Sequence, residues 1–169
     1  MKTICLFLLS VLGFHALSYC QAAYQKAYDL GGTAEFRDAA LTVNKSVITT
    51  GKLQTSYAHI YVFLLKLDSS GNSQWVKKYG DTGSGFSGAN FVYSVTGGGY
   101  LFGGQTNNLG SGIGNLEFFV TKTDDTGAIE WSKVYGGMAY GSCNAVTPTA
   151  DGGYVFAGGI AGGLGGSDI

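Results

Sequence analysis

Trp75-Val76-Lys77-Lys78-Tyr79-Gly80 returns as Trp131-Ser132-Lys133-Val134-Tyr135-Gly136, at an offset of 56 residues (131 − 75). The same offset carries Lys66 onto Lys122, Asp68 onto Asp124 and Gly71 onto Gly127. A second motif, Gly98-Gly99-Tyr100-Leu101-Phe102-Gly103-Gly104, returns as Gly152-Gly153-Tyr154-Val155-Phe156-Ala157-Gly158 at an offset of 54 (152 − 98). An internal repeat of this length indicates one supersecondary unit copied along the chain.

The middle copy contains four short runs typical of β-strands. They are Phe91–Val95, Tyr100–Gly103, Leu116–Thr123 and Ile129–Val134. Gly97-Gly98-Gly99 divides the first two runs, and Asp124-Asp125-Thr126-Gly127 suits a tight hairpin between the last two. Four antiparallel strands in roughly 56 residues match the size and content of one β-propeller blade. The sequence therefore predicts an all-β fold of tandem four-stranded antiparallel blades.

Three copies cover the chain at about residues 24–75, 76–131 and 132–169. The first is the most divergent, with Tyr28-Asp29-Leu30-Gly31-Gly32 where the later copies have Tyr-Gly. The third stops where a third strand is expected, so the chain holds about two and a half blades, fewer than the roughly four to eight of a closed ring. We expect either a fragment of a longer protein or a unit that completes itself by self-association. The tryptophan of each last strand is expected to pack between blades, and the Gly-Gly pairs to permit close approach where blades crowd near the axis.

The N-terminus has the pattern of a secretory signal peptide. Lys2 precedes an apolar run, Ile4–Phe14, and small or polar residues follow. Residues 1–20 are the predicted signal peptide, with cleavage after Cys20 and with Ala22 or Ala23 as alternatives. A lipoprotein cleavage box ending at Cys20 is disfavoured by the bulky Tyr19. Since no second apolar stretch approaches the roughly 20 residues of a membrane span, residues 21–169 are expected to be secreted or extracellular.

Charge and cysteine content exclude several classes of partner and site. Charged residues make up 12% of the chain and nearly cancel, which does not indicate a nucleic acid or an anionic membrane as partner. The 29 glycines, 11 tyrosines and 10 phenylalanines indicate short aromatic strands joined by many turns. Cys143 is the only cysteine after Cys20 and is expected to be a small buried apolar residue.

Trp131 to Gly137 followed by Asp151 to Gly158 resembles the tandem β-propeller repeats of large secreted and cell-surface proteins. The resemblance covers about residues 24–169 and implies the fold, but no particular activity. Tyr100-Leu101-Phe102-Gly103-Gly104 resembles kelch repeats. The stretch from Asp124 to Trp131 is similar to the tryptophan-docking repeat of quinoprotein dehydrogenases and to the Asp-box of sialidases, with one residue too few for the former and one too many for the latter. All four families are propellers, so they agree on architecture and differ in chemistry.

Few residues suggest catalysis or metal binding. After residue 20 the only histidine is His59, which favours a structural role over a general base and disfavours zinc or copper sites. Asp124 and Asp125 form a carboxylate pair that could hold calcium, but hairpin-turn chemistry is the favoured interpretation. Gly83 to Gly88 matches G-x-G-x-x-G, yet a strand and not a helix follows, so it is interpreted as an inter-strand loop, as is the glycine-rich stretch Gly162–Asp168. No catalytic, cofactor-binding or metal-binding residue is predicted.

These features together favour a binding or structural module over an enzyme. Aromatic, glycine-rich loops offer stacking surfaces for a carbohydrate or an extracellular protein. The alternative is a propeller-class enzyme, either sialidase-like or quinone-dependent, with its site outside this stretch. A sialidase needs an arginine cluster for its substrate's carboxylate, and Arg37 is the only arginine. Asn44-Lys45-Ser46 is a sequon that predicts glycosylation at Asn44 in a eukaryotic source.

Overall fold

The computed structural model describes residues 26–57, 59–80, 85–107, 116–135 and 140–161, in which all regular structure is β-strand. The strands are β1 (Thr33–Leu41), β2 (Val47–Ser56), β3 (His59–Leu67), β4 (Ser73–Tyr79), β5 (Gly85–Ser94), β6 (Tyr100–Thr106), β7 (Glu117–Thr123), β8 (Ile129–Tyr135), β9 (Tyr140–Pro148) and β10 (Tyr154–Ala161). The prediction of an all-β fold is confirmed.

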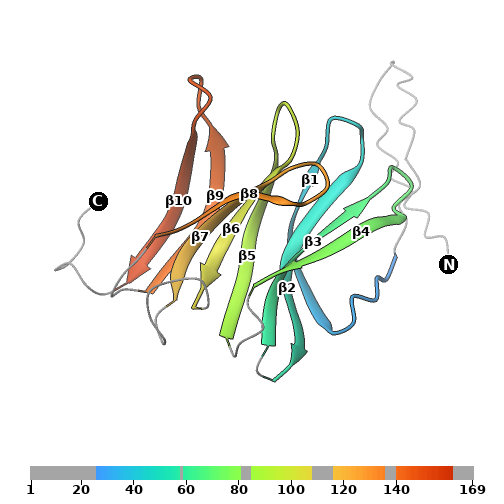
Figure 1. Cartoon of the computed structure of the whole chain (residues 1–169), viewed down its shortest axis with the longest axis horizontal. Helices are drawn as coiled ribbons and strands as arrows, with labels where there is room; N and C mark the ends of the chain where they lie inside the picture. The colour runs from blue at the N-terminus through green and yellow to red at the C-terminus, as the bar shows by residue number, and fades with distance from the viewer. Residues whose placement is uncertain (1–25, 58, 81–84, 108–115, 136–139, 162–169) are drawn as a thin grey trace, which may run out of the picture.

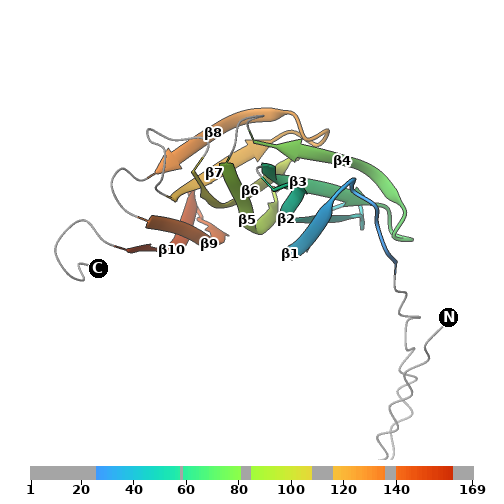
Figure 2. The same ribbon diagram turned by 90° about the horizontal axis from the view of Figure 1, so that it is seen from below.

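The strands form two four-stranded meanders and a hairpin (Figure 1). The first sheet is β1-β2-β3-β4 and the second is β5-β6-β7-β8. The third unit is the hairpin β9-β10, called the third hairpin below. Every pairing within these units is antiparallel. A short parallel pairing, His59 with Gly85 and Ile60 with Phe86, joins β3 to β5. Figure 2 shows β4 and β8 along one side of the molecule and β1, β9 and β10 toward the other.

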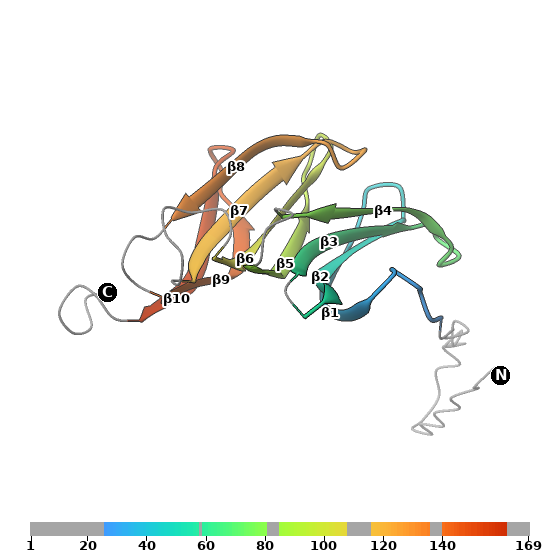
Figure 3. The same cartoon turned by 60° about the horizontal axis from the view of Figure 1, so that its bottom comes forward.

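Figure 3 shows β4 beside β3 and β8 beside β7, and the pairings of these strands repeat residue for residue in the first two sheets. Val62 pairs with Tyr79 and Lys66 with Trp75, while Phe118 pairs with Tyr135 and Lys122 with Trp131, so each partner is displaced by the 56 residues of the sequence repeat. Even the register shift recurs, after Lys66 and after Lys122. The sequence repeat is therefore a repeat of structure, although its divisions at residues 75 and 131 fall inside β4 and β8.

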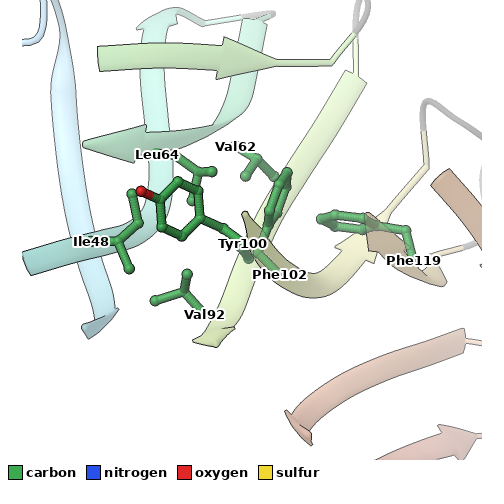
Figure 4. Packing of buried hydrophobic residues seen from close by; sticks show 8 residues of the cluster. Ile48, Val62, Leu64, Val92, Tyr100, Phe102 and Phe119 are labelled. Atoms are coloured by element: carbon green, nitrogen blue, oxygen red, sulfur yellow. The ribbon is translucent and has the colours of Figure 1, made fainter. Parts of the chain in front are cut away.

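The main core lies between the first and second sheets (Figure 4). Tyr100 and Phe102 of β6 pack with Ile48, Val62 and Leu64 of the first sheet, and all five are at most 1% exposed. Trp75 packs against this cluster, with its ring centroid 5.9 Å from that of Tyr100. Trp131 packs likewise on a cluster that joins the second sheet to Cys143 of β9. Both tryptophans thus pack between neighbouring sheets, as the sequence predicted.

One predicted loop is a strand. Gly85–Gly88, the part of the G-x-G-x-x-G stretch that the structure describes, begins β5, so its interpretation as an inter-strand loop was wrong. Ser87, Gly88 and Ala89 are buried and pair with Thr106, Gln105 and Gly104. Such small residues carry little intrinsic strand preference, so tertiary pairing and not local propensity makes them a strand.

Other predicted features lie outside the described residues. They are the signal peptide at residues 1–20, its cleavage site, Gly83 and the glycine-rich stretch Gly162–Asp168. In the part of the chain that the structure describes, no helix is long and apolar enough to cross a membrane.

Candidate binding site on the first strands

Each sheet's first strand carries a β-bulge at the same place in the repeat. The pairing of β1 skips Arg37, and that of β5 skips Asn90. In the third hairpin the register shifts between Ala157 and Gly158, which pair with Ala145 and Cys143, so that Asn144 is the extra residue. A bulge re-aims the side chain of its extra residue. Three polar residues therefore occupy one position of three structural copies.

A glycine opposite each bulge makes the bulge possible. Cβ atoms added to Gly51, Gly104 and Gly158 would lie 1.9, 2.0 and 2.1 Å from the carbonyl oxygens of residues 35, 88 and 142. No side chain fits at such distances. The sequence predicted that the Gly-Gly pairs allow close approach between blades near an axis, but at Gly104 of the Gly103-Gly104 pair the close approach is between paired strands of one sheet.

The bulged residues are linked across the three first strands. The Arg37 guanidinium donates a hydrogen bond to Asn90 Oδ1. The Asn90 amide Nδ2 lies 3.0 Å from Asn144 Oδ1 and 3.0 Å from the Cys143 carbonyl oxygen. Ser142 Oγ in turn donates to Asn144 Oδ1 at 2.9 Å. These bonds place β1, β5 and β9 side by side.

Asp38, the residue after the first bulge, adds a second link. Its Oδ2 accepts a 2.8 Å hydrogen bond from the backbone N–H of Val92 in β5. The neighbouring charges pair as well, since Glu35 accepts from Lys52 Nζ at 2.7 Å and from Arg37 Nε at 2.9 Å. The Lys52 hydrogen bond, followed by that from Arg37, lowers the pKa of the Glu35 carboxyl. Positive and negative groups are therefore balanced around Arg37.

A pocket of about 250 Å³ opens beside the bulges. Residues of β1, β5 and β9 line it, namely Arg37, Asp38, Asn90, Phe91, Val92, Tyr93, Asn144, Ala145 and Val146. Its volume is slightly below the roughly 300 to 1,000 Å³ of common small-molecule sites. Each wall strand contributes a group that can form hydrogen bonds. Tyr93 is among the lining residues, and its ring packs edge-to-face with Tyr154 at 6.3 Å between the centroids.

Two of the bulged side chains keep donors for a ligand. Arg37 uses Nε and Nη1, and Asn144 uses only its Oδ1 oxygen, in the hydrogen bonds between described residues. Arg37 Nη2 and the Asn144 Nδ2 group remain for a ligand. By contrast, Asn90 links the strands to each other. Its Oδ1 accepts a hydrogen bond from β1, and its Nδ2 group donates hydrogen bonds to β9.

Asp124 and Asp125 serve the turns, as the favoured interpretation predicted. Asp124 Oδ1 accepts 2.8 Å hydrogen bonds from the backbone N–H groups of Thr126 and Ala128, and Asp125 Oδ1 accepts one from Gly99. The Thr126 hydroxyl, which also donates to Asp124, is the main cause of the lowered pKa of that carboxyl. Asp68 makes the corresponding bonds in the first sheet.

The other residues singled out by sequence lie apart from the pocket lining. His59 begins β3, with its ring edge-to-face with Tyr61. Asn44 is exposed in the turn between β1 and β2, where an attached glycan would meet solvent. Cys143 is buried at 2% exposure, and burial raises the pKa of its thiol. No three His, Cys, Asp or Glu side chains are grouped as a metal site among the residues described.

Sequence reasoning missed Arg37, Asn90 and Asn144, although a signal was present. Each lies 14 residues before its opposing glycine (51 − 37, 104 − 90 and 158 − 144). The flanking residues differ between copies, so the constant spacing is visible only once the glycines are aligned. No protein-family model matches the chain, and no curated protein sequence matches it.

Proposed function

We propose that the chain is a secreted β-propeller module that binds an extracellular ligand through the pocket on its first strands, and that it is not an enzyme. Three observations support the propeller: repeated four-stranded meanders, tryptophans packed between sheets, and first strands set side by side. Propellers arrange four-stranded sheets around a central channel. The pocket is the observation that carries the binding role.

The ligand class that fits the pocket best is a neutral carbohydrate. Charges balance around Arg37, so a strong anion gains little there. Hydroxyl groups both donate and accept hydrogen bonds, and they can pair with the Asn144 amide and Arg37 Nη2 while a sugar face contacts the Tyr93 ring. An extracellular protein presenting such a glycan is included in this class.

A binding test separates the pocket from the rest of the surface. The purified chain is applied to a glycan array, and affinities of the best ligands are measured by calorimetry. Asn144→Asp keeps the oxygen that Asn90 needs but removes the amide donors, so affinity should fall about 2- to 13-fold, the value of one hydrogen bond. Gln74→Glu, the same change at an exposed position of β4, should leave affinity unchanged.

Two results would refute the proposal. One is an array without a ligand, or a ligand whose affinity responds equally to both variants. The other is turnover of a fluorogenic sialoside or a quinone-dependent oxidation by the purified chain, which would support the enzyme alternative.

Secretion and glycosylation are part of the same proposal. Expression of the full chain in a eukaryotic secretory cell should release into the culture medium a protein that begins at Gln21. Its mass should fall on endoglycosidase treatment, and Asn44→Gln should abolish that change, because Asn44 lies in an exposed turn. Retention in the cytosol, or an unmodified Asn44, would contradict this part.

A further inference from the structure

The motif Trp-x-Lys-x-Tyr has a defined task in the described fold. Trp75, Lys77 and Tyr79 alternate along β4, so their side chains share one face. All three close on the turn glycine of the second sheet: a Cβ added to Gly127 would lie 2.9 Å from Tyr79 Oη, 3.0 Å from Lys77 Cδ and 3.2 Å from Trp75 Cη2. The Tyr79 hydroxyl donates to the Gly127 carbonyl at 2.8 Å. The motif of one sheet thus packs on the Asp-x-x-Gly turn of the next and donates a hydrogen bond to it. We call this contact the clasp.

The same clasp occurs a second time at the N-terminal side. The Tyr28 hydroxyl donates to the Gly71 carbonyl at 2.8 Å, and Lys26 Nζ donates to the Ser70 carbonyl at 3.0 Å. Lys26 and Tyr28 match Lys77 and Tyr79 at a common offset of 51 (77 − 26 and 79 − 28). Both Asp-x-x-Gly hairpin turns in the described residues are therefore already clasped.

A third copy of the motif, on β8, contacts no such turn among the described residues. Lys133 and Tyr135 are exposed on β8, and the Tyr135 ring stacks on Phe118 at 4.7 Å. Tyr135 is 40% exposed, and within the described part of the chain no acceptor is bonded to its hydroxyl. Its counterpart Tyr79 is mostly buried, which raises the pKa of that phenol.

In the described part of the chain, β10 presents an open strand edge. β2 and β6 each pair on both sides, whereas β10 pairs only with β9 among the described strands. Val155 is 52% exposed, while Leu101, at the matching position of β6, is fully buried. An open edge of backbone N–H and C=O groups is a template for another strand.

A small cavity marks where a side chain of the added strand would enter. It measures about 130 Å³ and is lined in part by Phe118, Cys143 and Phe156. The corresponding residues of the preceding sheets are Val62, Ala89 and Phe102, which cluster around Phe119 of β7. Phe119 stands five residues before its turn aspartate, as Phe63 does in the first sheet (124 − 119 and 68 − 63).

We propose that the β10 edge, the cavity and the side chains of Lys133 and Tyr135 bind a β-hairpin with the pattern Phe-x-x-x-x-Asp-x-x-Gly. The first strand of the bound hairpin pairs with β10, and its phenylalanine fills the cavity. The glycine carbonyl of the hairpin's turn accepts a hydrogen bond from the Tyr135 hydroxyl. Each of these contacts has a counterpart around the second sheet, where β7 pairs with β6, Phe119 packs in the main core and the Gly127 carbonyl accepts a hydrogen bond from Tyr79. The surface is distinct from the first-strand pocket and does not depend on the ligand proposed there.

The test uses the hairpin that the chain itself provides. A labelled peptide of residues 116–135, with its ends joined by an added disulfide, is titrated into the full purified chain by fluorescence anisotropy. We expect saturable binding. Tyr135→Phe in the full chain, with the peptide unchanged, should weaken this binding about 2- to 13-fold, the effect of one hydrogen bond. The matched control Tyr57→Phe, at a fully exposed tyrosine, should bind like the parent.

Two further measurements report on the rest of the interface. The peptide variant Phe119→Ala should bind at least about tenfold more weakly, because it leaves the cavity unfilled. Amide hydrogen exchange of Tyr154–Ala161 should slow when the parent peptide binds. Asn144→Asp should not alter peptide affinity, which separates this surface from the carbohydrate pocket.

Three outcomes would overturn the inference. They are absence of saturable binding, binding insensitive to both Tyr135→Phe and Phe119→Ala, and a Tyr135-dependent dimer without peptide. The last result would identify a second copy of the chain as the occupant.

Discussion

At the scale of single residues, the bulge glycines connect the sequence repeat to the candidate binding site. Each bulge pushes a carbonyl oxygen of the opposing strand to within about 2 Å of where a Cβ would stand. The glycine is thus the condition for a polar residue to leave the strand register and face the pocket. Loss of the glycine should therefore affect folding and the pocket together.

Gly104→Ala should destabilise the chain by about 2 to 4 kcal/mol, since its methyl group would overlap the Gly88 carbonyl oxygen and force the strands apart. Urea unfolding followed by tryptophan fluorescence measures the change. Gly159→Ala is the control, because no atom lies within 4 Å of its added Cβ, and its stability should stay within about 0.5 kcal/mol of the parent. Equal effects of the two substitutions would contradict this account of the repeat glycines.

The turn aspartates predict a loss of stability in acid. Hydrogen bonds from Asn72, Thr126 and Thr149 are the main causes of lowered pKa values at Asp68, Asp124 and Asp151 respectively. A lowered folded pKa favours the folded state whenever the carboxyl is ionised. The stabilisation by these carboxylates should therefore be complete above the Asp pKa of the unfolded chain, about 3.9. It should be lost as the pH falls through that value toward the lower pKa values of the folded state.

Asp124→Asn tests the acid prediction with little change of shape. The amide oxygen can still accept the turn's hydrogen bonds, but the side chain no longer titrates. Urea unfolding between about pH 5 and pH 2.5 should show a shallower loss of stability in the variant. An unchanged slope would show that Asp124 does not contribute to acid sensitivity.

At the scale of elements, the clasp between β4 and the β7–β8 turn should be measurable in the isolated chain. Tyr79→Phe removes the hydrogen bond to Gly127 and should cost about 1 kcal/mol of unfolding free energy. Tyr135→Phe, the same change at the matching position of β8, should cost much less, because its hydroxyl has no bonded acceptor in the described part of the chain. Denaturant midpoints of both variants measure the difference, and a reversed order would contradict the clasp.

Elements built from the repeat were predictable from the sequence, and those built from tertiary pairing were not. Offsets of 56 and 54 predicted the strands around Trp75, Tyr100 and Trp131, because aromatic strands and glycine turns carry a local signal. β1 and the start of β5 were missed, since small and polar residues there become strands only through their partners. The bulged site residues were missed for the same reason: their placement depends on the opposing glycine and on neighbouring sheets.

At the scale of the molecule, stability should be uneven. The cluster that joins the first and second sheets contains seven side chains that are at most 1% exposed, while Val155, Ala157, Gly158 and Gly159 of β10 are exposed. Native-state hydrogen exchange should therefore be slowest in β2, β3 and β6 and faster in β9 and β10. Slowest exchange in β10 would contradict the described packing.

Three copies of one repeat bring Arg37, Asn90 and Asn144 to one pocket, and we propose that a carbohydrate binds there. Nuclear magnetic resonance of the ¹⁵N-labelled chain, titrated with the best carbohydrate from the array, tests this most directly. We expect the side-chain signals of Arg37 and Asn144 to shift most, followed by those of Asn90 and Tyr93. Shifts confined to the turns at Asp68 and Asp124, or no shifts at saturating carbohydrate, would contradict it.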